Sequence, residues 1–170
     1  MTDIAIVWDE ALLEGDFVMA GPDLRQDQGL ETAVIISLMS DRLANADDVI
    51  PDGTTDRRGW WGDLPLASGN AGGTVPQPDD LIGSRLWLLS RAKMTPQTLT
   101  LAQQYCQEAL QWLIDDGVAA EVNVQTSWIA TGQMGIAITI ARQVPGGAPD
   151  GAPVNQSFNL AWSMTLGVQA

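Results

Sequence analysis

The clearest structural signal in the sequence is the run TPQTLTLAQQYCQEALQWLIDDG, residues 95–117. Thr95 is a good N-cap, Pro96 suits the first helical position, and Gly117 suits the position just beyond a helix. Between these ends, apolar residues recur at intervals of three and four, which is typical of a helix with one buried face. The run therefore predicts a long helix on a core, with Cys106 buried as a core residue.

The sequence on the C-terminal side of this helix alternates between apolar and polar residues. Residues 120–128, 134–141 and 158–168 each have this period of two, which predicts strands. Residues 131–133 carry a hairpin-turn signal, and residues 144–156, rich in Pro and Gly, are expected to form a loop. Three neighbouring strands of this kind predict an antiparallel sheet with one face on the helices.

The sequence on the N-terminal side predicts a hairpin followed by two more helices. Residues 4–8 and 16–20 are expected to pair, and residues 24–29 are polar and turn-like. Helices are predicted over residues 30–43 and, for two to three turns, within residues 78–93, where Arg85 is expected near the helix end. The prediction is one α+β domain over residues 1–170, with about three helices and a flexible loop at about residues 64–79.

Charge is distributed unevenly along the chain. The net charge is −13, and 16 of the 21 acidic residues lie within residues 1–80. An acidic half argues against nucleic acid as a partner, because phosphates require a basic face. Two interpretations stay open, a solvated surface and an acidic face that meets a basic partner.

The stretch Asp56-Arg57-Arg58-Gly59-Trp60-Trp61-Gly62-Asp63 links the acidic half to the predicted helical core. Glycines on both sides of a Trp pair disfavour a helix, so a loop or strand edge is expected. One interpretation is an anchored loop whose indoles cover the core. The other is a docking surface, because Trp and Arg dominate interface hot spots. Arg57, Arg58, Trp60, Trp61 and Asp63 are accordingly candidate partner contacts.

Asp115 and Asp116 lie at the C-terminal end of the long helix, where the macrodipole disfavours acids by about 0.3–1 kcal/mol each. Either both carboxylates are solvated, or a cation or an Arg of another chain meets them. They are therefore further candidate partner contacts.

Catalytic and metal-binding patterns are missing from the sequence. It contains no His and a single Cys, so a Ser–His–acid triad, a transition-metal cluster and an internal disulfide are ruled out. It has no phosphate-binding Gly-rich loop, no apolar run long enough to span a membrane and no secretion signal. We expect no catalytic residue, no metal, no cofactor and no membrane contact, and we expect synthesis in a cytoplasm.

Several sequence blocks together resemble a known family, the tail protein of Mu-type phages and prophages called gene product forty-six. The blocks, which extend over nearly the whole chain, are Thr32–Val34, Ser40–Arg42, Arg58–Asp63, Gly83–Leu89, Tyr105, Glu108–Leu110, Trp112–Leu113 and Asp116–Gly117. That family is similar to the small wedge protein of T-even phage baseplates, long labelled lysozyme-like.

The resemblance implies a structural wedge subunit of a contractile tail baseplate, located in the virion. Its partners would be other wedge proteins and tube or sheath proteins. The wider group that includes the T-even wedge protein carries a Glu-Pro-Arg motif after its main helix. This chain reads Asp115-Asp116-Gly117-Val118 at that place, so the motif is absent. Two alternatives stay open, a peptidoglycan hydrolase and a carbohydrate-binding tail module that stacks sugar on Trp60 and Trp61.

Overall fold

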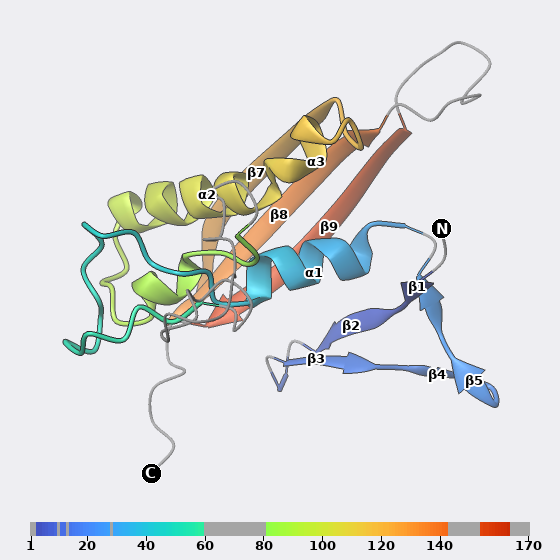
Figure 1. Cartoon of the computed structure of the whole chain (residues 1–170). Helices are drawn as coiled ribbons and strands as arrows, with labels where there is room; N and C mark the ends of the chain where they lie inside the picture. Colours follow the sequence, from blue (N-terminus) through green and yellow to red (C-terminus); the bar gives the residue numbers. More distant parts are fainter. Residues whose placement is uncertain are drawn as a thin grey trace, which may run out of the picture.

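The computed structural model describes residues 3–9, 11–12, 14–27, 29–59, 81–142 and 154–163. Within these ranges the chain forms a three-stranded antiparallel sheet, helices on one face of that sheet, and a set of six short strands near the N-terminus (Figure 1). The combination of antiparallel strands with separate helices is α+β, as predicted.

The sheet is built from strands β7 (Glu121–Ala130), β8 (Gln133–Arg142) and β9 (Val154–Ser163), in that spatial order. Val124 pairs with Ile138, which pairs with Phe158, so the predicted apolar sets share one face. The prediction of a loop over residues 144–156 is wrong at its end, because β9 already begins at Val154. The predicted strand residues 164–168 lie outside the described ranges.

The predicted long helix is confirmed, but it is interrupted at Gln111. α2 (Pro96–Leu110) is followed by the single turn α3 (Trp112–Asp115). The Thr98 N–H donates to Thr95 Oγ1 at 3.2 Å, which confirms the N-cap. Gly117 has φ +70°, a left-handed conformation that favours glycine beyond a helix end.

The other two helix predictions are longer than the observed helices. α1 covers Glu31–Met39 and ends before residues 40–43, and residues 81–93 contain only the 3₁₀ turn η1 (Leu86–Leu89). The described ranges thus hold two helices longer than one turn, against the three or so predicted. The remainder of the predicted second helix, residues 78–80, is not among the described residues.

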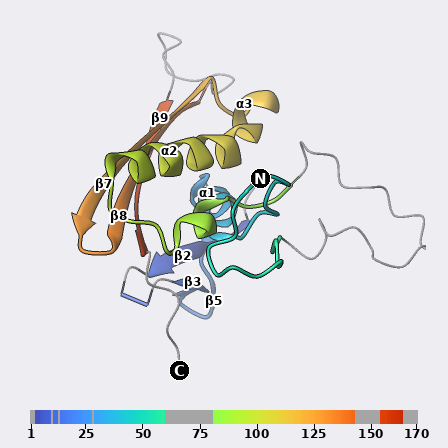
Figure 2. The ribbon, with the colours of Figure 1, turned by 90° about the vertical axis from the view of Figure 1, so that its left-hand side faces the viewer.

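The core lies between the inner face of the sheet and the two longer helices, which cover that same face (Figure 2). α1 supplies Val34 and Leu38, and α2 supplies the fully buried Ala102 and Cys106. The sheet contributes Val124, Met134, Ile136, Ile138 and Ile140. Residues on the opposite face, such as Asn123, Gln125 and Thr139, are exposed.

The N-terminal region is a ring of paired short strands that we call the arm. It consists of β1 (Asp3–Ile4), β2 (Ile6–Asp9), β3 (Glu14–Phe17), β4 (Met19–Ala20), β5 (Asp23–Leu24) and β6 (Gln26–Asp27). The predicted pairing of residues 4–8 with 16–20 is confirmed only in part, as β2–β3. Ile4 instead pairs with Gln26, and Met19 and Ala20 pair with Leu24 and Asp23, although residues 24–29 were expected to form only a turn. Figure 1 shows the arm projecting beyond α1.

Candidate interaction site

A backbone bridge between residues 40–42 and 83–85 organises the centre of the molecule. Ser84 N–H donates to the Ser40 carbonyl at 2.9 Å, and Arg42 N–H donates to the Ser84 carbonyl at 2.9 Å. Gly83 has φ +97°, and a Cβ at this position would collide with the Ser40 carbonyl oxygen. These backbone groups are used by the bridge, which explains why α1 ends early and why the predicted second helix does not form.

Side chains reinforce the same bridge. The Ser84 hydroxyl donates to the Leu38 carbonyl at 2.6 Å, and the Trp87 indole N–H donates to the Arg42 carbonyl at 2.8 Å. Both Ser84 and Trp87 are buried, so each satisfies its polar group inside the protein.

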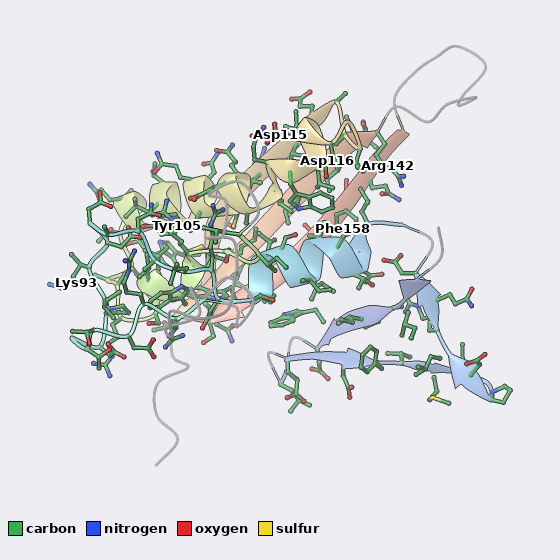
Figure 3. The ribbon with its side chains drawn as sticks, viewed as in Figure 1. Lys93, Tyr105, Asp115, Asp116, Arg142 and Phe158 are labelled. Carbon is green, nitrogen blue, oxygen red and sulfur yellow. The ribbon has the colours of Figure 1, made fainter. Side chains whose placement is uncertain are left out.

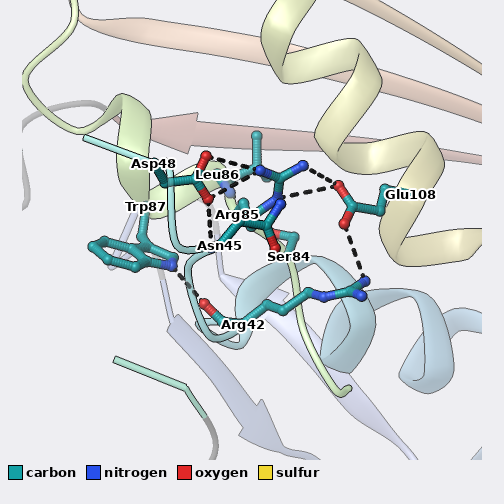
Figure 4. A network of polar contacts seen from close by, with 8 residues as sticks. All are labelled: Arg42, Asn45, Asp48, Ser84, Arg85, Leu86, Trp87 and Glu108. Carbon is teal, nitrogen blue, oxygen red and sulfur yellow. Dashed lines mark hydrogen bonds and ion pairs between the residues drawn. The ribbon is translucent and has the colours of Figure 1, made fainter. Parts of the chain in front are cut away.

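An ion-pair network surrounds this bridge, and we call it the Arg85 network (Figure 4). Arg85 Nη1 donates to both Asp48 oxygens at 2.9 and 3.0 Å, while its Nη2 donates to Glu108 Oε2 at 2.6 Å. Arg42 Nη1 pairs with the other Glu108 oxygen at 3.5 Å. Two cations are thus paired with two anions. Because Arg85 contacts both Asp48, in the loop after α1, and Glu108, on α2, it holds that loop against α2.

The Arg85 guanidinium is held in its charged form. Burial lowers the pKa of Arg85, but hydrogen bonds to Glu108 and Asp48 outweigh it, so the pKa lies above its ordinary value. The guanidinium also lies 4.5 Å from the centre of the Tyr105 ring, and burial raises the pKa of that phenol. Arg85 therefore lies at the centre of a partly buried ion-pair cluster, whereas the sequence predicted it near the end of a helix.

Arg57 and Arg58 lie in the same segment as Asp48, about ten residues further along the chain. Arg57 donates through Nη2 to the Ala44 carbonyl. Arg58 Nη1 pairs with Asp41 Oδ2 at 2.6 Å, and its guanidinium lies 4.6 Å from the centre of the Trp87 ring. Arg58 has φ +51°, which is costly for a residue other than glycine, so these contacts hold a strained turn.

The remaining candidates are separated from this pair. Trp60, Trp61 and Asp63 lie outside the described residues. Asp115 and Asp116 are exposed at the end of α3 (Figure 3), where the Gln111 side-chain amide donates to Asp115 Oδ1 at 3.0 Å. The structure therefore places the four described candidates in two regions, with Arg57 and Arg58 in a loop and Asp115 and Asp116 at the end of α3.

The sequence interpretation did not identify the Arg85 network. Its members are spread over residues 42–108, and no spacing rule brings them together. The sequence did contain one signal, an arginine directly before the apolar run Leu86–Leu89, since a charge beside buried side chains requires partners.

The described residues show no arrangement typical of metal or nucleophilic chemistry. Among them, no group of three or more Cys, Asp or Glu side chains is placed to hold a metal ion. Burial raises the pKa of the Cys106 thiol to about 12, so this thiol is a core group as predicted. None of the helices in the described ranges is long and apolar enough to cross a membrane.

The chain belongs to the family described as phage protein GP46, which matches residues 30–149. The chain is 40% identical over 163 residues to the baseplate protein gp46 of Escherichia phage Mu, covering 96% of this chain and 99% of that protein. It is also 38% identical to the Mu-like prophage FluMu protein gp46 of Haemophilus influenzae, covering 96% of this chain and all of that protein. The resemblance inferred from the sequence blocks is confirmed.

Proposed function

We propose that the chain is a structural, non-enzymatic subunit of a contractile phage or prophage tail baseplate. In this proposal it is a wedge protein of the virion whose neighbours are other wedge proteins and proteins of the tube or sheath. The main support is the match along nearly the whole chain to a protein named as a baseplate protein of phage Mu.

The arm supplies the physical support. Phe17 is 57% exposed on β3 and Met19 59% on β4, and Leu12 is 66% exposed in the turn between β2 and β3. Large apolar side chains exposed close together along a short stretch of chain are a feature of surfaces that contact other proteins. The candidate contacts at Arg57, Arg58, Trp60, Trp61 and Asp63 belong to the same proposal.

The two described carboxyl groups with a shifted pKa give the hydrolase alternative no support. A glycosidase acid needs a raised pKa so that it keeps its proton. Burial raises the pKa of Asp27, but hydrogen bonds from Thr32 and Gly29 outweigh it and leave the pKa lowered. Hydrogen bonds from Thr54 lower the pKa of the exposed Asp52. Both shifts run opposite to the need of a general acid.

The test uses the phage or prophage that encodes the chain. We expect the wild-type chain in purified tails by mass spectrometry and no intact tails after deletion of its gene. A Phe17→Asp, Met19→Asp double variant should keep its melting temperature as a purified protein and be lost from tails. Val49→Asp is the matched control, because Val49 is 85% exposed outside the arm.

Two results would contradict the proposal: normal tails in the deletion, or lysis of cell walls by the purified chain that is lost on substitution of a single acid. Normal incorporation of the double variant would remove the arm from the interface and leave the baseplate role standing.

A further inference from the structure

A groove lies between α1 and the junction of α2 and α3. It encloses about 730 Å³. Its lining includes Ile36 and Ser37 of α1, Ile82 of the segment that precedes η1, and Trp112, Asp115 and Asp116 of α3 and its C-terminal end. Three separate segments therefore form one concave surface.

The floor of this groove is apolar and accessible. Ile36 is 42% exposed in the middle of α1, and Ile82 is 37% exposed beside it. The Trp112 indole N–H donates to Ser37 Oγ at 3.1 Å, so the polar atom of this ring is already used. The ring can offer a partner only its apolar surface, which together with the two isoleucines suits an aliphatic side chain.

One end of the groove is negative. Asp115 and Asp116 are exposed there, and none of the lining residues is basic. Among the ion pairs of the described residues, none includes either carboxylate. The carbonyl end of α3 adds partial negative charge at the same place. A partner that brings a cation to this end would meet uncompensated charge.

We propose that the groove binds a short segment of a neighbouring tail protein in which an apolar side chain is followed closely by Lys or Arg. The apolar side chain contacts Ile36, Ile82 and Trp112, and the cation pairs with Asp115 or Asp116. This inference rests on the proposed function for the source of the partner. A second copy of this chain is a poor occupant, because two chains of net charge −13 repel one another.

The experiment places a photo-crosslinking amino acid at Ile36 in the full chain, within tails assembled by the encoding phage. The control position is Gln104, which is exposed on α2 outside the groove. We expect position 36 to crosslink to another tail protein, at a peptide with Lys or Arg within about one helical turn of an apolar residue. Position 104 should not yield that peptide.

Charge-reversal variants then test the negative end of the groove. Asp115→Lys with Asp116→Lys should lower the crosslink yield about tenfold, because two attractions become repulsions. Glu121→Lys is the matched control, as Glu121 is an exposed acid of β7 outside the groove, and it should leave the yield unchanged. Circular dichroism of each purified variant checks that the fold is kept.

The outcomes separate the two proposals. If the chain is missing from wild-type tails, the baseplate role fails and the groove proposal fails with it. If the chain is present, the groove proposal alone is overturned by any of three results: no crosslink at position 36, a crosslink within this chain or to a second copy, or a yield that charge reversal does not change.

Discussion

The C-terminal sheet and the N-terminal arm are both antiparallel, but the sheet buries one face in the core, whereas most of the arm is exposed to solvent. β7, β8 and β9 have 10 residues each and place Ile136, Ile138 and Ile140 in the core at 1% exposure or less. The arm's strands have two to four residues, and β3 and β4 are exposed throughout. Strand pairing alone stabilises little without a buried face, so the sheet can hold the fold while the arm depends on its attachments.

Those attachments are few and specific. Ala5 is buried, the Ile6 N–H donates to Thr32 Oγ1 at 3.1 Å, and the Trp8 indole N–H donates to the Ala161 carbonyl at 3.1 Å. The arm is thus fixed to α1 and β9 through β2, and Arg25 and Asp27 near its C-terminal end also contact α1, whereas β3 and β4 are exposed throughout. An element fixed along one edge, with apolar side chains on its free part, is suited to a contact that forms on assembly.

The largest expected difference between the two regions comes from truncating one apolar side chain in each. Ile138→Ala should lower the free energy of unfolding by about 2–5 kcal/mol, because it opens a cavity between the sheet and the helices. Phe17→Ala should change it by less than about 0.5 kcal/mol, since this ring is 57% exposed. Urea unfolding of both variants measures the difference. Equal losses would show that the arm belongs to the folded core.

A second comparison uses the same residue type in the two regions. Arg85 has a side chain 15% exposed between Asp48 and Glu108, whereas Arg25 of the arm is 46% exposed and pairs with Glu31 at 3.3 Å. Arg85→Ala should cost about 1.5–3 kcal/mol, because two carboxylates lose charged hydrogen bonds. Arg25→Ala should cost less than about 1 kcal/mol. Urea unfolding at low and high salt distinguishes them, and a costlier Arg25 variant would contradict the ranking.

The sequence predicted those parts of the fold whose signals are local. The Thr95 cap, the C′ glycine at Gly117 and the alternation in the three C-terminal strands depend on neighbouring residues, and each was found as expected as far as residue 163. A helix cap or a strand period is visible within a short window, because its physical cause acts within that window.

Features that depend on distant residues could not be predicted. The prediction of a helix within residues 78–93 was wrong because the backbone at Ser84 pairs with Ser40 and Arg42, more than 40 positions away. The pairs β4–β5 and β1–β6 were missed because their strands of two residues are too short to show a period. For the candidate contacts, Asp115 and Asp116 were identified from a local conflict with the helix dipole, but Ile36 and Ile82 were not, since only the fold brings them together.

The smallest expected effect lies at the junction between the two regions. The Asp27 carboxylate accepts from the Gly29 N–H at 2.7 Å and from the Thr32 N–H at 2.9 Å, so the last residue of the arm satisfies one N–H of the first turn of α1, whose N-cap residue Leu30 makes no side-chain cap bond. Asp27→Ala should cost about 1 kcal/mol at pH 7, as for helix-capping side chains. Asp23→Ala is the control, because that carboxylate accepts only from the adjacent Leu24 N–H among the described contacts.

The pH dependence of this effect follows from the lowered pKa of Asp27 in the folded state. A carboxyl with a lowered folded pKa contributes stability above its unfolded pKa, near 4, and loses it as the pH falls through the folded value. The difference between wild type and Asp27→Ala should therefore shrink between about pH 5 and pH 2 in urea unfolding. A constant difference over that interval would mean that the carboxylate charge does not stabilise the junction. The contacts of Ile6 with Thr32 and of Arg25 with Glu31 would then be the hydrogen bonds that matter at this junction.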